Sequence, residues 1–158
     1  MLFICKYEQT PTDIIKLCDI TEFKAALKKH LAPSRYKFLA HGSKLGNKYL
    51  TQIRLGRSYL NDHSFQIQMT PSPQCSCNAA RESTNHYFLD CKDNSKERWT
   101  MFGVFEQYLP KFHTYTKNKK LDIILNGFDR DSNNIYRTIV TLQYSVQNFV
   151  LKTKRFVK

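Results

Sequence analysis

The sequence has no long run of apolar residues, and this absence limits where the protein can reside. No stretch of the 158 residues approaches about 18 uncharged apolar ones, so we expect no transmembrane helix and no membrane partner. The opening MLFICKYEQT has too short an apolar run for a secretory signal peptide, and Glu8 follows it closely. The five cysteines are an odd number, which argues against a disulfide framework. We therefore expect an intracellular protein, in the nucleus or cytoplasm, with reduced thiols that can bind a metal.

Acidic residues are absent from two long segments of a chain whose formal net charge is +12. The basic residues of segment 24–57 are Lys24, Lys28, Lys29, Arg35, Lys37, Lys44, Lys48, Arg54 and Arg57. Those of segment 132–158 are Arg137, Lys152, Lys154, Arg155 and Lys158. Acid-free basic segments predict a polyanionic partner, and the phosphate backbone of RNA or DNA is the commonest one. The alternative interpretation is a charged, solvated surface that only keeps the protein soluble.

Runs that alternate apolar and polar residues are also scarce, which predicts a mostly α fold. Capping and spacing signals predict helices that begin at Asp19 and Ser34, two more over 46–56 and 58–69, and others that begin near Asn94 and Leu121. The clearest helix begins at Ile135 and ends in a basic tail. We divide the chain into an N-terminal segment (1–18), a basic helical region (19–70), a cysteine–histidine segment (71–93) and a C-terminal helical region (94–158).

Each predicted helix has an apolar face that we expect to point into the core. The inward residues of the helix over 46–56 are Tyr49, Leu50 and Ile53, and the helix over 58–69 carries the apolar residues Leu60, Phe65 and Ile67. Those of the helix after Asn94 are Trp99, Phe102, Phe105 and Leu109. Those of the last helix are Ile135, Ile139, Leu142, Val146, Phe149 and Val150.

Three of the cysteines lie close together in CSCNAARESTNHYFLDC, with a histidine between the second and the third. The spacing of Cys75, Cys77, His86 and Cys91 is C-x-C-x8-H-x4-C, which suits a tight turn followed by a helical turn with one extra residue. Three thiolates and one imidazole fill the four tetrahedral positions of Zn²⁺, so this zinc knuckle is predicted to be structural rather than catalytic. The alternative is three ordinary thiols beside a surface histidine.

The same segment resembles the zinc-binding region that follows the reverse transcriptase domain in non-LTR (jockey-like) retrotransposon proteins. The residues of this segment that carry the resemblance are Cys75, Cys77, Glu82, Ser83, His86 and Cys91. Upstream, LTQIRLGRSYLNDHSF is similar to a second stretch of that family at Leu50, Arg54, Gly56, Leu60 and His63. The chain departs from the pattern at Gln52, where arginine is frequent, and at Asn78, where glycine is usual. The resemblance implies a structural zinc ion and a position near a template or target strand, with a reverse transcriptase domain as a partner in cis or in trans.

Catalytic motifs are missing from the sequence. It contains no Tyr-x-Asp-Asp motif to hold the metal ions of a polymerase, and no Pro-Asp dipeptide follows Cys91 as a restriction-like endonuclease would require. Phosphate-binding glycine loops, H-E-x-x-H and G-x-S-x-G are absent too. We therefore expect a protein that is not an enzyme.

The candidate nucleic-acid-binding residues come from both basic segments. They are Lys48, Arg54 and Arg57 with His63 nearby, and Lys152, Lys154 and Arg155 in the tail. Tyr49, Tyr59 and Tyr87 are candidates to stack on unpaired bases, although core packing is the favoured interpretation for all three. The sequence does not distinguish RNA from DNA. The alternative function is a structural module that docks on another protein without binding nucleic acid.

Overall fold

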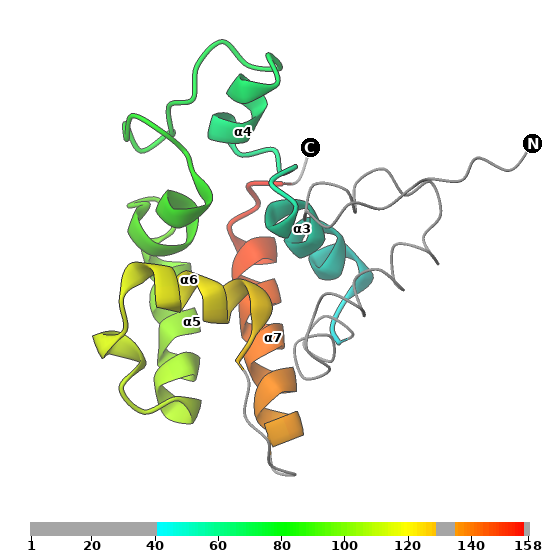
Figure 1. Ribbon diagram of the computed structural model, residues 1–158, viewed down its shortest axis with the longest axis vertical. Coiled ribbons are helices and arrows are strands. Elements are labelled where there is room, and N and C mark those ends of the chain that lie inside the picture. The colour runs from blue at the N-terminus through cyan, green and yellow to red at the C-terminus, as the bar shows by residue number, and fades with distance from the viewer. Residues whose placement is uncertain (1–40, 129–134, 157–158) are drawn as a thin grey trace, which may run out of the picture.

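The computed structural model describes residues 41–128 and 135–156, and these residues form helices and loops with no strand among them (Figure 1). The α-helices are α3 (Lys44–Arg54), α4 (Asn61–Gln66), α5 (Ser95–Tyr108), α6 (Lys117–Asn126) and α7 (Ile135–Lys152). A π-helix, η2, covers His86–Asp90, and a 3-10 helix, η3, covers Phe112–Thr114. None of the helices described is long and apolar enough to cross a membrane. The mostly α fold is thus confirmed for this part of the chain.

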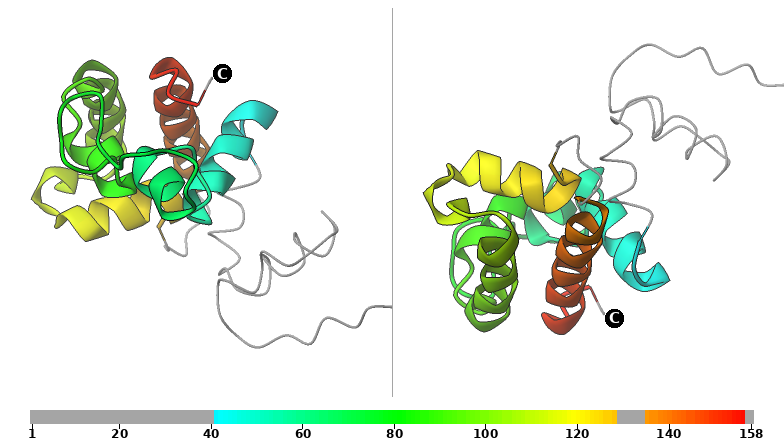
Figure 2. Two further views of the ribbon diagram at one scale, coloured as in Figure 1. Left: turned by 90° about the horizontal axis from the view of Figure 1, so that it is seen from above. Right: turned by 90° about the horizontal axis from the view of Figure 1, so that it is seen from below.

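Helix α7 lies in the middle of the molecule, and α5 and α3 pack on either side of it (Figure 2). Helix α6 runs across α5 and α7 and also contacts η2. The short helix α4 stands apart from the others at one end of the molecule (Figure 1). This arrangement places the loop that contains the cysteines next to the C-terminal end of α7.

One apolar core joins α3, η2, α5, η3, α6 and α7. The inward faces predicted for α3 and α7 are confirmed wherever the side chains are described, because Tyr49, Leu50 and Ile53 are buried, as are Ile139, Leu142, Val146, Phe149 and Val150. The rings of Tyr87, Phe88 and Phe149 meet with centroid distances of 4.9 to 5.3 Å. Because η2 contributes two of these rings, the cysteine–histidine segment is part of the core and not an appendage.

Buried amides add a polar seam between α3 and α7. The Oε1 atom of Gln147 accepts from the backbone N–H of Ser43 at 2.8 Å, and Ser43 in turn caps α3 through its hydroxyl. The Nε2 atom of Gln147 donates to His41 O at 2.8 Å and to Asn47 Oδ1 at 2.9 Å. These bonds fix the register of the two helices, since buried amides are stable only with their partners in place.

Three local predictions were wrong. The helix expected over 58–69 is only the six residues of α4, and Phe65 and Ile67 are exposed, although Leu60 is buried. Trp99 lies on the outer face of α5 with 76% of its surface exposed. The side chain of Asn94 does not cap α5 and instead donates to the carbonyl of Tyr87. The helices predicted from Asp19 and Ser34 lie outside the described residues.

Candidate metal centre

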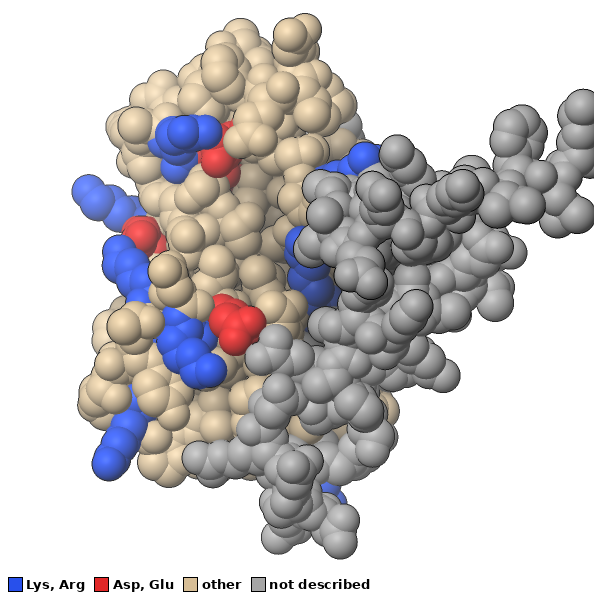
Figure 3. Space-filling view, in the orientation of Figure 1, with Lys and Arg blue, Asp and Glu red and all other residues tan. Residues whose placement is uncertain are grey.

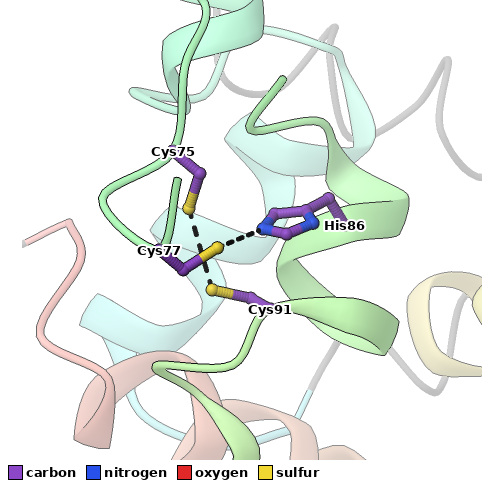
Figure 4. A group of neighbouring side chains, drawn as sticks. All are labelled: Cys75, Cys77, His86 and Cys91. Atoms are coloured by element: carbon purple, nitrogen blue, oxygen red, sulfur yellow. Dashed lines mark hydrogen bonds between the residues drawn. The ribbon is translucent and has the colours of Figure 1, made fainter. Parts of the chain in front are cut away.

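The structure brings Cys75, Cys77, His86 and Cys91 together (Figure 4). Their four potential ligand atoms all lie within 4.8 Å of one another. The Sγ atoms of Cys75 and Cys91 are 3.7 Å apart, and Cys77 Sγ is 3.2 Å from Nε2 of His86. A disulfide requires sulfur atoms about 2.05 Å apart, so these three cysteines are free thiols. The four residues can hold one metal ion.

The first two cysteines lie in a tight turn. The N–H of Cys75 donates to Ala79 O, and the N–H of Asn78 donates to Cys75 O, both at 3.0 Å. Asn78 has a φ of 69°, in the left-handed region that glycine and asparagine adopt most readily. An asparagine therefore suits this position, where the resembling family usually has glycine. The turn directs both sulfur atoms to the same side (Figure 4).

The other two candidate ligands come from the π-helix η2. Ser83 begins this turn, because its hydroxyl accepts from the N–H of His86 at 3.2 Å. The N–H of Cys91 donates to His86 O at 2.7 Å, which is the i to i+5 bond of a π-helix. This wider turn places side chains five residues apart on the same face. The separation of five residues between His86 and Cys91 thus has a direct structural cause.

The three thiols have different proton affinities. Burial raises the pKa of Cys75 and raises that of Cys91 to about 12. Hydrogen bonding from the backbone N–H of Ala79 lowers the pKa of Cys77 to about 7. Cys77 is therefore the thiol that most readily becomes a thiolate, and a bound cation would favour deprotonation of the other two.

The buried carboxylate of Glu82 connects this centre to the rest of the fold. This carboxylate accepts hydrogen bonds from Nε of Arg155 at 2.5 Å and from Nη2 of Arg155 at 2.6 Å. It also accepts one from the backbone N–H of Asn61 at 2.7 Å. Arg98 of α5 donates to the carbonyl of Cys91 at 2.7 Å. The cysteine–histidine segment is thereby tied to α4, α5 and the residues that follow α7.

Four of the predicted nucleic-acid-binding residues are exposed and make no ion pair within residues 41–128 and 135–156, namely Lys48, Arg57, Lys152 and Lys154. Lys152 lines a pocket together with the acidic side chains of Glu82, Asp93 and Glu97, of which Glu82 pairs with Arg155. Three further acidic side chains are in ion pairs elsewhere. Asp62 pairs with Arg81, Asp90 with Lys117 and Glu106 with His113. Figure 3 shows further lysines and arginines on the side formed by α5 and α6, with acidic side chains between them.

The side chains of the other three predicted residues make hydrogen bonds within the protein. Arg54 donates from Nε to the carbonyl of Leu125, and burial lowers the pKa of its guanidinium. His63 uses Nδ1 to donate to Ser58 O at 2.9 Å. Arg155 binds Glu82 and also donates to the carbonyl of Tyr59. Arg54 and Arg155 are held by the fold and do not belong to the exposed basic surface.

Two of the three candidate stacking tyrosines are core residues, as favoured. Tyr87 is buried, and its hydroxyl lies 2.6 Å from that of Thr153. Tyr49 is buried against the ring of Phe156. Tyr59 is exposed.

Two features of the structure were not predicted from the sequence. Glu82 matches a family motif, but its role depends on a buried contact with Arg155, which joins residues 73 positions apart. The exposure of Phe65, Ile67 and Met69 is the second, since the first two are expected from the sequence to lie in the core. One local signal does indicate this exposure. Pro71 and Pro73 end the helix that contains Phe65, so that helix is short and its apolar face is small.

No protein-family model, curated protein or solved structure matches this chain.

Proposed function

We propose that this chain is a non-catalytic, zinc-stabilised module that binds nucleic acid. The resemblance in sequence further supports the proposal that it corresponds to the region C-terminal to the reverse transcriptase domain of non-LTR retrotransposon proteins. In that setting the module would help to hold an RNA template or a DNA target. A polymerase domain, in cis or in trans, would supply the chemistry.

The donor set supports zinc as the metal. Zn²⁺ binds cysteine sulfur at about 2.3 Å in a tetrahedron, which separates two sulfur ligands by about 3.8 Å. The distance of 3.7 Å between the sulfur atoms of Cys75 and Cys91 agrees with this spacing. Three thiolates and one imidazole complete the coordination, so the ion would have a structural role.

The observation that carries the nucleic-acid proposal is a surplus of exposed cations without acidic partners. Lys48, Arg57, Lys152 and Lys154 are such residues within the described part of a chain with a net charge of +12. Phosphates bind cations of this kind and release condensed counterions, which provides most of the sequence-independent affinity. The fold also orders part of this surface, since Arg155 anchors the segment containing Lys152 and Lys154 to Glu82.

A docking module without nucleic-acid binding is the second candidate. One observation favours it, which is the exposure of the apolar side chains Phe65, Ile67 and Met69 on and after α4. A docking surface of this kind depends weakly on salt, whereas phosphate binding depends on it steeply.

The test combines elemental analysis of the purified chain with fluorescence anisotropy titrations of short RNA and DNA at two salt concentrations. We expect one zinc per chain and affinity that falls steeply as salt rises. Cys91→Ser is expected to lose the metal and to melt at a lower temperature, with His113→Ala as the control, because His113 is exposed and pairs only with Glu106 among the described residues. Zinc without salt-dependent binding would favour the docking module, and absence of metal would reject the zinc centre.

A further inference from the structure

An open cavity of about 660 Å³ lies beside α4. Its lining residues are Phe65, Gln66, Gln68, Met69, Thr70, Pro71 and Arg81. Phe65 and Met69 expose 44% and 60% of their surface, although large apolar side chains usually avoid water. The cavity is open to solvent, and it lies beside the helix that stands apart from the others (Figure 1).

The lining combines three kinds of group. Phe65 offers an aromatic face, Gln66 and Gln68 offer amides that both donate and accept, and Arg81 offers a cation. Within the described part of the chain, no acidic side chain lines this cavity. Arg81 pairs through Nε and Nη2 with Oδ1 of Asp62, which lies outside this lining, so a carboxylate already balances its charge and only Nη1 remains to bind a ligand. A planar ligand with polar edges and an attached anion would satisfy all three groups.

The backbone at Gln68 adds an independent observation. The N–H of Met69 donates to Ser64 O at 2.8 Å and that of Gln68 to Phe65 O at 3.0 Å, a pattern that ends many helices. Gln68 has a φ of 59°, in the left-handed region that glycine occupies at this position in most such motifs. A side chain is present here although glycine would relieve strain, and strained positions concentrate at binding sites. Gln68 therefore keeps a side chain at the cavity in a position where glycine is the usual residue.

We propose that this cavity receives an unpaired base of a single-stranded polynucleotide. The base stacks on Phe65, the amides of Gln66 and Gln68 bind its polar edge, and Arg81 binds an adjoining phosphate. This inference rests on the proposed nucleic-acid function and adds a preference for single strands. A peptide that places an apolar side chain beside Phe65 and Met69 is the other occupant, and the comparison with an abasic strand distinguishes the two.

The experiment measures anisotropy with two labelled single-stranded oligonucleotides of equal length and charge, one with bases and one abasic throughout. Phe65→Ala is expected to weaken binding of the first about 5- to 100-fold and to leave abasic binding unchanged. Trp99→Ala is the matched control, an exposed aromatic on α5, and should alter neither. Gln68→Gly is expected to raise the melting temperature and yet weaken binding of the base-containing strand.

The outcomes separate this inference from the function on which it rests. Salt-dependent binding that is equal for both oligonucleotides and unaffected by Phe65→Ala would overturn the base site and keep the nucleic-acid function. No binding by the wild type would overturn both. An increase in stability of Gln68→Gly with full affinity would show that the side chain serves no ligand. A protein partner that binds the wild type and not the Phe65→Ala variant would then identify a docking surface.

Discussion

Glu82 connects the candidate metal centre to two other parts of the fold. Its carboxylate is buried and accepts hydrogen bonds from a guanidinium and from the N–H of Asn61. A buried carboxylate is tolerated only where such partners compensate for the hydration that burial removes. These bonds join the cysteine segment, the start of α4 and the end of α7 at a single point.

We predict that Glu82→Gln lowers the free energy of unfolding by about 3 kcal/mol, because it leaves Arg155 half-buried without a counter-ion. Asp90→Asn is the matched control, since Asp90 and Lys117 form an ion pair that is exposed on both sides. Breaking that pair should change stability by less than about 1 kcal/mol. Chemical denaturation measures both, and equal effects would contradict the role assigned to Glu82.

The thiols predict how metal binding depends on pH. In the metal-free site the pKa of Cys77 is lowered to about 7, while those of Cys75 and Cys91 are raised. At pH 8 Cys77 is then mostly thiolate and the other two are thiols, so zinc binding should release about two protons from the cysteines. Affinity should rise with pH, because protons compete with the metal.

Calorimetry in buffers with different ionisation enthalpies counts the protons released. Cysteines in an unfolded segment have pKa values near 8.5, so at pH 9 a site that forms only with the metal would release about one proton, whereas the preformed site would still release about two. Affinity that is independent of pH would contradict ligation by thiolates.

At the scale of elements, the packing of α3 against α7 depends on the absence of a side chain at Gly46. A Cβ atom there would lie 2.7 Å from Oε1 of Gln147. That amide cannot easily move, since it is buried and bound to Ser43 N, His41 O and Asn47. The hydrogen bonds of Gln147 therefore form only if α3 and α7 approach closely, and this close approach is possible only because residue 46 has no side chain.

Gly46→Ala is predicted to lower the free energy of unfolding by about 1–3 kcal/mol through this overlap. Gly103→Ala is the matched substitution on α5, where a Cβ atom would meet nothing within 4 Å. It should stabilise the protein by about 0.5–1 kcal/mol, because alanine is the better helix former. Thermal melts of the two variants should shift in opposite directions, and shifts of the same sign would contradict the packing described.

At the scale of the whole molecule, the basic residues divide into exposed and internal ones. Lys152→Ala with Lys154→Ala, and separately Lys48→Ala with Arg57→Ala, should each leave the melting temperature unchanged. Each pair should also reduce the slope of log affinity against log salt by up to about two, one for each phosphate that is no longer neutralised. Arg54→Ala should instead destabilise the fold, because its guanidinium binds Leu125 O. Unchanged slopes for both pairs would place the phosphate-binding residues elsewhere.

Much of the fold could be predicted locally. Helices α3 and α7 have apolar residues at helical spacing, and that spacing identifies their inward faces because side chains three and four apart share a face. Trp99 fits the same spacing on α5 and is exposed. Periodicity indicates which residues share a face but not how wide a face the neighbouring helices cover.

The sequence by itself determined the four candidate ligands, since their chemistry and spacing are local and the turn and the π-helix that bring them together span few residues. It also determined the net charge of the chain. Only the tertiary structure decided which cations remain exposed, because the partners of Arg54 and Arg155 are 71 and 73 residues away along the chain. A basic side chain that binds a distant carbonyl or carboxylate can have the same neighbours in the sequence as one that is exposed to water. Only the packing of the chain distinguishes the two.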